Sequence, residues 1–241
     1  MLVVIPAFNE EASVGKVVEQ VVAMKYDVLV VDDGSSDRTS YRAKEAGAQV
    51  LRFPFNLGVG VALRAGLRFA VEHGYRCVVQ VDGDGQHPVE QIEDLRAAAS
   101  KFGAQLVIGS RFISDDSTLT SPLPRLAIMK LLGFLASRYA GTRITDATSG
   151  FRIIVEPLLG EFARHLPGYY LGDTFEALVA AARADYVIHE IPANLSKRMH
   201  GASSENNVTA SLQVAKTLIV SMARLRAPLQ SVTHSWNEVT S

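Results

Sequence analysis

The sequence predicts an α/β fold in which helices cover both faces of a mostly parallel sheet. Short apolar runs of strand length alternate with segments of helical spacing through the first half of the chain. The connections between them are short, as in units that join parallel strands through a helix. A C-terminal amphipathic helix is expected over Val208–Arg226, where apolar residues recur on one stripe.

The expected elements of the first half alternate between strand and helix. Leu2–Pro6 is a continuous apolar run, typical of a strand buried on both faces. The strands expected after it are Val28–Val31, Gln49–Phe53, Arg76–Val81 and Leu106–Ser110. The helices expected between them are Glu10–Met24, Ser36–Ala46, Val59–His73 and one that begins at Pro88. Asn9 and Ser36 are the expected N-caps of the first two helices.

The chain changes character after residue 111. Ile113–Pro124 is rich in Ser, Thr, Asp and Pro and is expected to form a loop. The elements expected beyond it are helices over Arg125–Tyr139, Pro157–His165 and Asp173–Ala184 and strands over Thr148–Val155 and Tyr186–Ile191. We therefore predict one domain over residues 1–227, made of halves 1–111 and 112–227, and a tail over residues 228–241.

Composition and net charge exclude several classes of protein. The 241 residues include 24 Lys and Arg and 25 Asp and Glu, a net charge of −1. This balance argues against a general nucleic-acid binder, which needs a basic surface. Cys77 is the single cysteine, which excludes a disulfide scaffold and a cysteine-based metal site. The N-terminus lacks a signal-peptide pattern and no apolar stretch is long enough to span a membrane, so we expect a cytoplasmic protein.

An Asp-Gly-Asp sequence follows the fourth expected strand. Asp82 and Asp84 lie two residues apart, so they point the same way in an extended segment, and Gly83 lets a ligand approach the backbone. Two carboxylates at a strand end suit Mg²⁺ or Mn²⁺ bridging a diphosphate, and Gln86 adds a neutral oxygen ligand. The alternative is a polar turn that closes the strand. Because ligands bind beyond the carboxyl ends of parallel strands, we favour the metal site.

A second acidic pair, Asp32-Asp33, ends the second expected strand. A carboxylate there can accept hydrogen bonds from a nucleobase or a ribose. The segment Asn56-Leu57-Gly58-Val59-Gly60 is similar to a dinucleotide-binding glycine loop, but Leu63 occupies the position of the third glycine. We therefore interpret it as a glycine-rich entry to a helix.

Together these segments resemble glycosyltransferase family 2, whose members have the GT-A type of Rossmann-like sheet. Within the family they are most similar to the dolichyl-phosphate mannose synthase and polyprenyl-phosphate sugar transferase branch. The matching segments are Val3–Glu10, Val30–Ser35, Asn56–Gly58, Asp82–Pro88, Gly109–Arg111 and Thr148–Arg152. The resemblance implies that residues 1–111 bind a nucleotide sugar and that residues 112–227 form the acceptor half.

The resemblance also implies roles for individual residues. The residues implied to contact the nucleotide sugar are Pro6, Phe8, Glu10, Asp33, Asp82, Gly83, Asp84 and Arg111. The implied ligands of the Mg²⁺ or Mn²⁺ ion are Asp82, Asp84 and Gln86. Arg152 and Arg198 are implied near phosphate or the acceptor, although Arg152 is also a candidate ion-pair partner of Asp146.

The implied reaction moves a hexose from a UDP- or GDP-sugar with inversion at the anomeric carbon. A hydroxyl acceptor requires a general base, whereas a lipid phosphate is already ionised and requires none. Asp146 and Asp173 are the candidate bases outside the metal group. For Asp173 a helix N-cap is an equal alternative.

The charge distribution bears on the acceptor. Thr120–Arg143 and Ala193–Ala227 each carry a net charge of +4 and each contains an apolar helix. Basic apolar helices suit a membrane surface or an anionic lipid, although they also pack on a sheet or on a second subunit of a homodimer. We therefore predict a peripheral enzyme at the inner face of the membrane with a polyprenyl phosphate acceptor. The alternatives are a soluble family-2 enzyme that acts on a hydroxyl of a small metabolite, and a nucleotide-binding protein without turnover.

Overall fold

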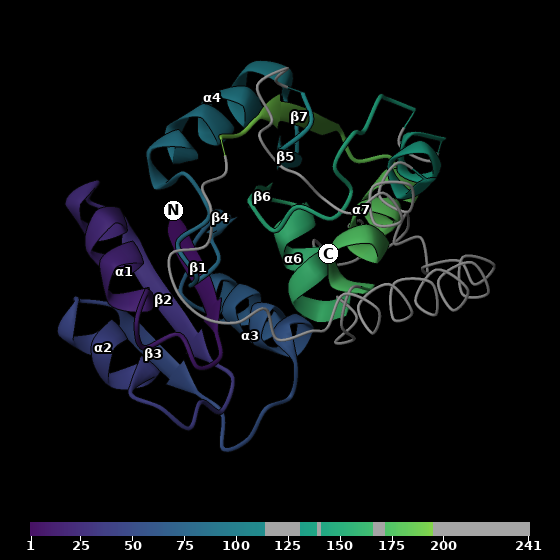
Figure 1. Ribbon diagram of the computed structural model, residues 1–241. Coiled ribbons are helices and arrows are strands. Elements are labelled where there is room, and N and C mark those ends of the chain that lie inside the picture. The colour runs from purple at the N-terminus through teal and green to yellow at the C-terminus, as the bar shows by residue number, and fades with distance from the viewer. Residues whose placement is uncertain (114–130, 139–140, 166–171, 195–241) are drawn as a thin grey trace, which may run out of the picture.

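The structure is a computed structural model, and it describes residues 1–113, 131–138, 141–165 and 172–194. Its centre is a seven-stranded sheet with the order β3-β2-β1-β4-β6-β5-β7 (Figure 1). The strands are β1 (Leu2–Ala7), β2 (Asp27–Asp32), β3 (Gln49–Arg52), β4 (Cys77–Gln80), β5 (Leu106–Ser110), β6 (Arg152–Val155) and β7 (Ile188–Pro192). All strand pairs are parallel except those of β6, which runs antiparallel to both β4 and β5.

Helices cover both faces of this sheet, as the sequence predicts. The helices are α1 (Val14–Ala23), α2 (Thr39–Glu45), α3 (Val59–Glu72), α4 (Ile92–Phe102), α6 (Leu158–His165) and α7 (Gly172–Arg183). A single 3₁₀ turn, Val89–Gln91, precedes α4, and residues 131–138 are also helical. Among the helices that the structure describes, none combines the length and the apolar character needed to cross a membrane.

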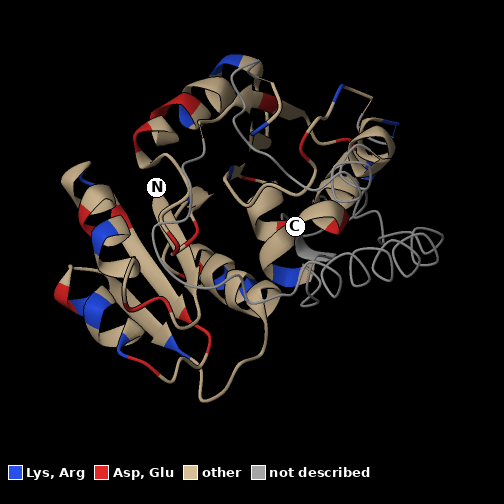
Figure 2. Ribbon diagram, viewed as in Figure 1, with Lys and Arg blue, Asp and Glu red and all other residues tan. Residues whose placement is uncertain are grey.

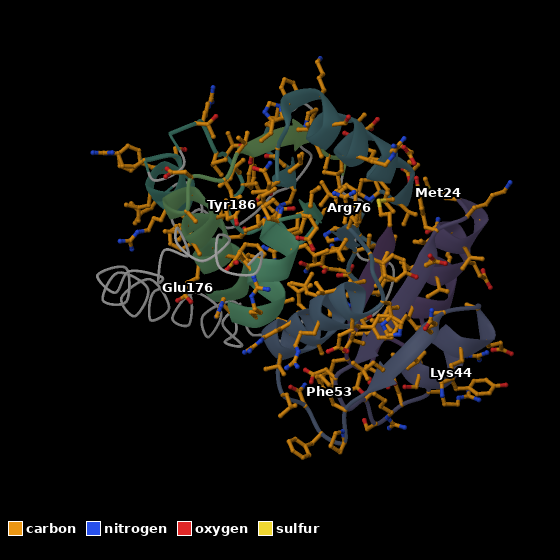
Figure 3. All side chains as sticks on the ribbon, turned by 180° about the vertical axis from the view of Figure 1, so that it is seen from behind. Met24, Lys44, Phe53, Arg76, Glu176 and Tyr186 are labelled. Carbon is orange, nitrogen blue, oxygen red and sulfur yellow. The ribbon has the colours of Figure 1, made fainter. Side chains whose placement is uncertain are left out.

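The core lies in two layers, one on each side of the sheet. Alternating residues of β1 divide between them: Leu2 and Val4 join the layer under α3, α6 and α7, whereas Val3 and Ile5 join the layer under α1 and α4. Side chains fill the space between sheet and helices when the molecule is seen from behind (Figure 3). The sheet is thus packed on both faces, and the polar loops follow the ends of its strands.

Two predicted helix caps are wrong, for one physical reason. Asn9 has φ +55° and its side-chain oxygen accepts a hydrogen bond from the Ser36 backbone N–H at 2.9 Å, so it joins the loop after β1 to the loop after β2. The helix α1 therefore starts at Val14, and α2 starts at Thr39. The Thr39 backbone N–H donates to the carboxylate of Asp37 instead of to Ser36. Asn9 and Ser36 bond to each other across the two loops, so neither side chain caps the helix that follows it.

Other boundaries differ by a few residues. The strand β6 begins at Arg152 rather than at Thr148. Residues 131–138 confirm part of the helix expected over Arg125–Tyr139. The expected helix Val208–Arg226 and the tail over residues 228–241 lie outside the described residues, so the domain division remains a prediction.

Candidate active site at the strand ends

Loops after three parallel strands and the segment before β6 come together at one edge of the sheet. The Asp33 backbone N–H donates to the carbonyl of Ala7, which places the ends of β1 and β2 side by side. Gly83 lies against the end of β1, since a Cβ atom at Gly83 would be 3.4 Å from that of Ala7. Gly150 lies beside Asp82, whose carboxylate oxygens would be 3.1 and 3.2 Å from a Cβ atom at Gly150. Acidic stretches mark this edge in Figure 2.

Asp82 and Asp84 stand in the turn that follows β4. Both are partly exposed, and 40% of the Asp82 side chain is accessible. Oδ1 of Asp84 accepts a hydrogen bond from the Gln86 backbone N–H at 3.0 Å, which holds Gln86 in the same turn. Carboxylate and amide oxygens are the donors that Mg²⁺ and Mn²⁺ prefer.

The oxygen atoms of Asp82, Asp84 and Gln86 suit a cation that keeps part of its coordination shell for substrate. In the described part of the chain, no three His, Cys, Asp or Glu side chains form a group that encloses a metal. Two carboxylates are what a Mg²⁺ ion usually takes from the protein when it also binds phosphate oxygens and water. The residues therefore suit a cation that bridges the protein and a diphosphate.

Arg111 follows β5 and forms a bidentate ion pair with Asp146. Nε of Arg111 donates to Oδ2 at 2.6 Å and Nη2 donates to Oδ1 at 2.7 Å. Nη2 also donates to Thr148 Oγ1 at 2.8 Å. The Asp146 side chain is fully buried, and that of Arg111 is 18% exposed. Burial acts to lower the pKa of Arg111, but the Asp146 carboxylate and the nearby charge of Asp82 hold that pKa above its usual value.

Glu190 completes this arrangement from β7. Its carboxylate accepts hydrogen bonds from the backbone N–H groups of Asp146 at 2.7 Å and of Thr145 at 2.8 Å. Burial raises the pKa of Glu190 in spite of these bonds. Sequence reasoning missed Glu190, because a single acid in a strand pattern does not name its partner. The one available signal was an acidic residue within a largely apolar edge strand.

Arg152 has a different neighbour from the one considered in the sequence. Its side chain is 2% exposed, and Nε donates to Oε1 of Gln80 at 2.9 Å within the buried sheet. Of the two alternatives for Arg152, the ion pair with Asp146 is not formed, and Arg111 donates to both oxygens of that carboxylate instead. The implied role of Arg152 near phosphate or the acceptor stays a prediction.

The acids at the end of β2 organise the opposite part of the edge. Asp32 is buried, and its carboxylate accepts hydrogen bonds from the Ser35 backbone N–H and the Ser40 hydroxyl. Asp33 is 3% exposed, and its two oxygens accept the backbone N–H groups of Leu57 at 2.7 Å and Gly58 at 2.8 Å. The structure thus uses Asp33 to anchor the loop between β3 and α3.

The anchoring role of Asp33 predicts a stability effect. The variant Asp33→Ala is expected to lower the free energy of unfolding by about 2–4 kcal/mol, because two hydrogen bonds to a charged oxygen are lost. Glu45→Ala, at the exposed end of α2, removes only a surface ion pair with Arg42 and should cost less than about 1 kcal/mol. Urea denaturation of the two variants measures the difference, and equal losses would contradict the anchoring role.

The remaining site candidates fall in different places. Pro6 is buried in β1, Phe8 is 42% exposed beyond it, and Oε2 of Glu10 accepts the Ser13 hydroxyl at 3.0 Å. Asp173 lies in the first turn of α7, and nothing further is described of its side chain. Arg198 lies outside the described residues.

Comparison with known proteins places this chain in a family. The family model described as glycosyl transferase family 2 matches residues 2–161. The polyprenol monophosphomannose synthase of Mycolicibacterium smegmatis is 33% identical over 159 residues, which cover 63% of this chain and 60% of that protein. The UDP-N-acetylglucosamine–dolichyl-phosphate N-acetylglucosaminyltransferase of Methanococcus voltae is 26% identical over 235 residues, covering 90% of this chain and 94% of the relative.

A solved structure supports the same architecture. The glucosyl-3-phosphoglycerate synthase from Mycobacterium tuberculosis, crystallised with Mn²⁺, uridine diphosphate and glucosyl-3-phosphoglycerate, has a TM-score of 0.67 at 24% identity. The match covers 92% of this chain and 79% of that one. At this identity the likeness establishes the fold. The chain therefore belongs to glycosyl transferase family 2 and is a glycosyltransferase with the GT-A fold.

Proposed function

We propose that the protein transfers a hexose from a UDP- or GDP-sugar to a polyprenyl phosphate, with inversion at the anomeric carbon. The named relatives support the choice of acceptor, since their names specify polyprenyl or dolichyl phosphate products or substrates. The observation that carries the proposal is that the Asp146 carboxylate is buried and paired with Arg111. Asp146 is the acid that a hydroxyl acceptor would most directly need as its general base.

The donor side of the proposal rests on the turn after β4. Asp82, Asp84 and Gln86 would hold a Mg²⁺ or Mn²⁺ ion, which supplies positive charge for the departing nucleoside diphosphate. The charge of Asp82 helps to raise the pKa of Arg111. The Arg111 guanidinium would therefore add positive charge in the same region. Pro6, Phe8, Glu10 and Asp33, at the ends of β1 and β2, would border the nucleoside.

The acceptor side rests on the ion pair of Arg111. A general base needs a carboxylate oxygen that can reach the proton of the nucleophile. The Asp146 carboxylate is fully buried and both its oxygens bond to Arg111. An ionised phosphate has no proton to remove, so it suits a site in which this acid is already committed to an arginine. If a hydroxyl were the acceptor, Asp173 would be the base left to consider.

Exposed apolar side chains support an approach to lipid. Residues 131–138 form a helix on which Leu131 is 49% and Phe134 is 68% exposed. This helix lies within the basic segment Thr120–Arg143. A basic surface with protruding apolar side chains suits peripheral contact with the inner face of a membrane.

Assays that pair sugar donors with matched lipids test the proposal. Labelled UDP-glucose, UDP-N-acetylglucosamine and GDP-mannose are each incubated with Mn²⁺ and one acceptor: a polyprenyl phosphate, the polyprenol of equal length, or a small hydroxylated compound. We expect label to enter the organic phase with one donor and only with the phosphate. Transfer to a small hydroxylated acceptor, with none to polyprenyl phosphate, would overturn the proposed acceptor in favour of the small-metabolite alternative.

A further inference from the structure

We infer that His87 is a positioning residue that holds Asp82 in the orientation needed to bind a divalent cation. The inference rests on the proposed metal role of Asp82. The sequence suggests no more for His87 than a turn beside Pro88. In the structure, however, both ring nitrogens of His87 face Asp82.

The first contact is to the main chain. The backbone N–H of Asp82 donates a hydrogen bond to Nδ1 of His87 at 2.9 Å. A ring nitrogen that accepts a hydrogen bond carries no proton, so the N–H of this ring is on Nε2. This tautomer directs the only N–H of the ring away from the main chain.

The second contact is to the carboxylate. Nε2 of His87 lies 3.4 Å from Oδ2 of Asp82. One imidazole thus holds the backbone of Asp82 through Nδ1 and faces its side chain through Nε2. Since Gly150 also lies against both carboxylate oxygens, the Asp82 side chain has neighbours that restrict its rotation.

The imidazole is itself held in place. Its side chain is 3% exposed, and its ring centroid is 5.3 Å from that of Phe151, with a tilt of 42°. Phe151 is fully buried and in turn lies against Gly109, where a Cβ atom would be 2.5 Å from the phenyl ring. Packed residues therefore connect β5 to Asp82 through Phe151 and His87. Groups that orient a metal ligand in this way strengthen metal binding without touching the metal.

Three substitutions separate the two contacts. His87→Asn places an amide oxygen near the position of Nδ1 and retains an acceptor for the backbone, but it has no group at Nε2. His87→Gln places an amide nitrogen near Nε2 and lacks the acceptor at Nδ1. His87→Phe keeps an aromatic ring beside Phe151 and removes both contacts. His165→Gln, at the exposed end of α6, is the control.

Mn²⁺ binding and stability are measured separately. Electron paramagnetic resonance of free Mn²⁺ gives the affinity, with and without UDP or GDP, and thermal unfolding gives Tm. We expect His87→Phe to weaken Mn²⁺ binding by about 10–100-fold. His87→Asn should keep a Tm near that of the unaltered protein and still bind Mn²⁺ several-fold more weakly. A turn-forming role alone would not produce this separation.

Two results would overturn the inference in distinguishable ways. If the unaltered protein binds Mn²⁺ and His87→Asn and His87→Phe bind it equally well, His87 does not position Asp82, while the metal site stands. If the unaltered protein binds Mn²⁺ no better than a variant with both Asp82→Asn and Asp84→Asn, the proposed metal site fails and the role of His87 fails with it.

Discussion

Asp84→Asn is expected to lower kcat/KM for sugar transfer by about 10³-fold, the loss that corresponds to about 4 kcal/mol of transition-state stabilisation. The substitution removes one negative charge and one strong oxygen ligand from the proposed cation site. Asparagine has the same shape and retains an oxygen that can accept the hydrogen bond of the Gln86 backbone N–H. The fold should therefore persist while the charge that stabilises the leaving diphosphate is lost.

Initial rates at several Mn²⁺ concentrations test this expectation. Part of the loss should be recovered at high Mn²⁺, since a weakened site still fills by mass action. The matched control is Glu72→Gln at the exposed end of α3, which removes the same charge before the start of β4, at the opposite end of that strand from the site. An Asp84→Asn enzyme that stays within threefold of the unaltered rate would refute a metal role for this carboxylate.

Asp146→Ala is expected to lower the free energy of unfolding by about 3–5 kcal/mol, because it leaves the largely buried charge of Arg111 without its carboxylate. The loss also removes the acceptor for the Arg111 backbone N–H and for the Thr148 hydroxyl. Urea denaturation followed by circular dichroism measures the change.

A double-mutant cycle with Arg111→Ala isolates the pair. The variant that carries both substitutions should lose less stability than the sum of the two single losses, because no buried charge is left unpaired. Asp146→Ala with unchanged stability would contradict the structural role of the pair. A stable Asp146→Asn protein that has lost all transfer, and only with a hydroxyl acceptor, would instead favour Asp146 as a general base.

The sheet was largely predictable because its central strands are buried on both faces. The run Leu2–Pro6 is almost the whole of β1, and Leu106–Ser110 coincides with β5. Such runs are decided by burial, which local composition records. The antiparallel position of β6 between β4 and β5 was not predictable in this way, since the direction of a strand leaves no mark on its apolar pattern.

The site residues also differ in how far the sequence predicts their contacts. Asp82 and Asp84 were predictable as neighbours at a strand end, because two residues that flank one glycine remain close whatever the rest of the chain does. The partner of Asp146 was not, because Arg111 is 35 residues away along the chain and comes near only through the order of β5 and β6. Asn9 and Ser36 show the same limit, since each has a good local cap position and takes a tertiary contact instead.

The sequence by itself determined the family, the alternation of strands and helices, and the acidic turn after β4, because each depends on residues close together in the chain. Only the tertiary structure decided that Asp146 forms an ion pair with Arg111 and that Asp33 anchors the loop before α3. It alone also decided that both ring nitrogens of His87 face Asp82. Buried charges and hydrogen-bonding groups must find partners wherever the fold brings them together, and strand order, rather than local sequence, sets those partners.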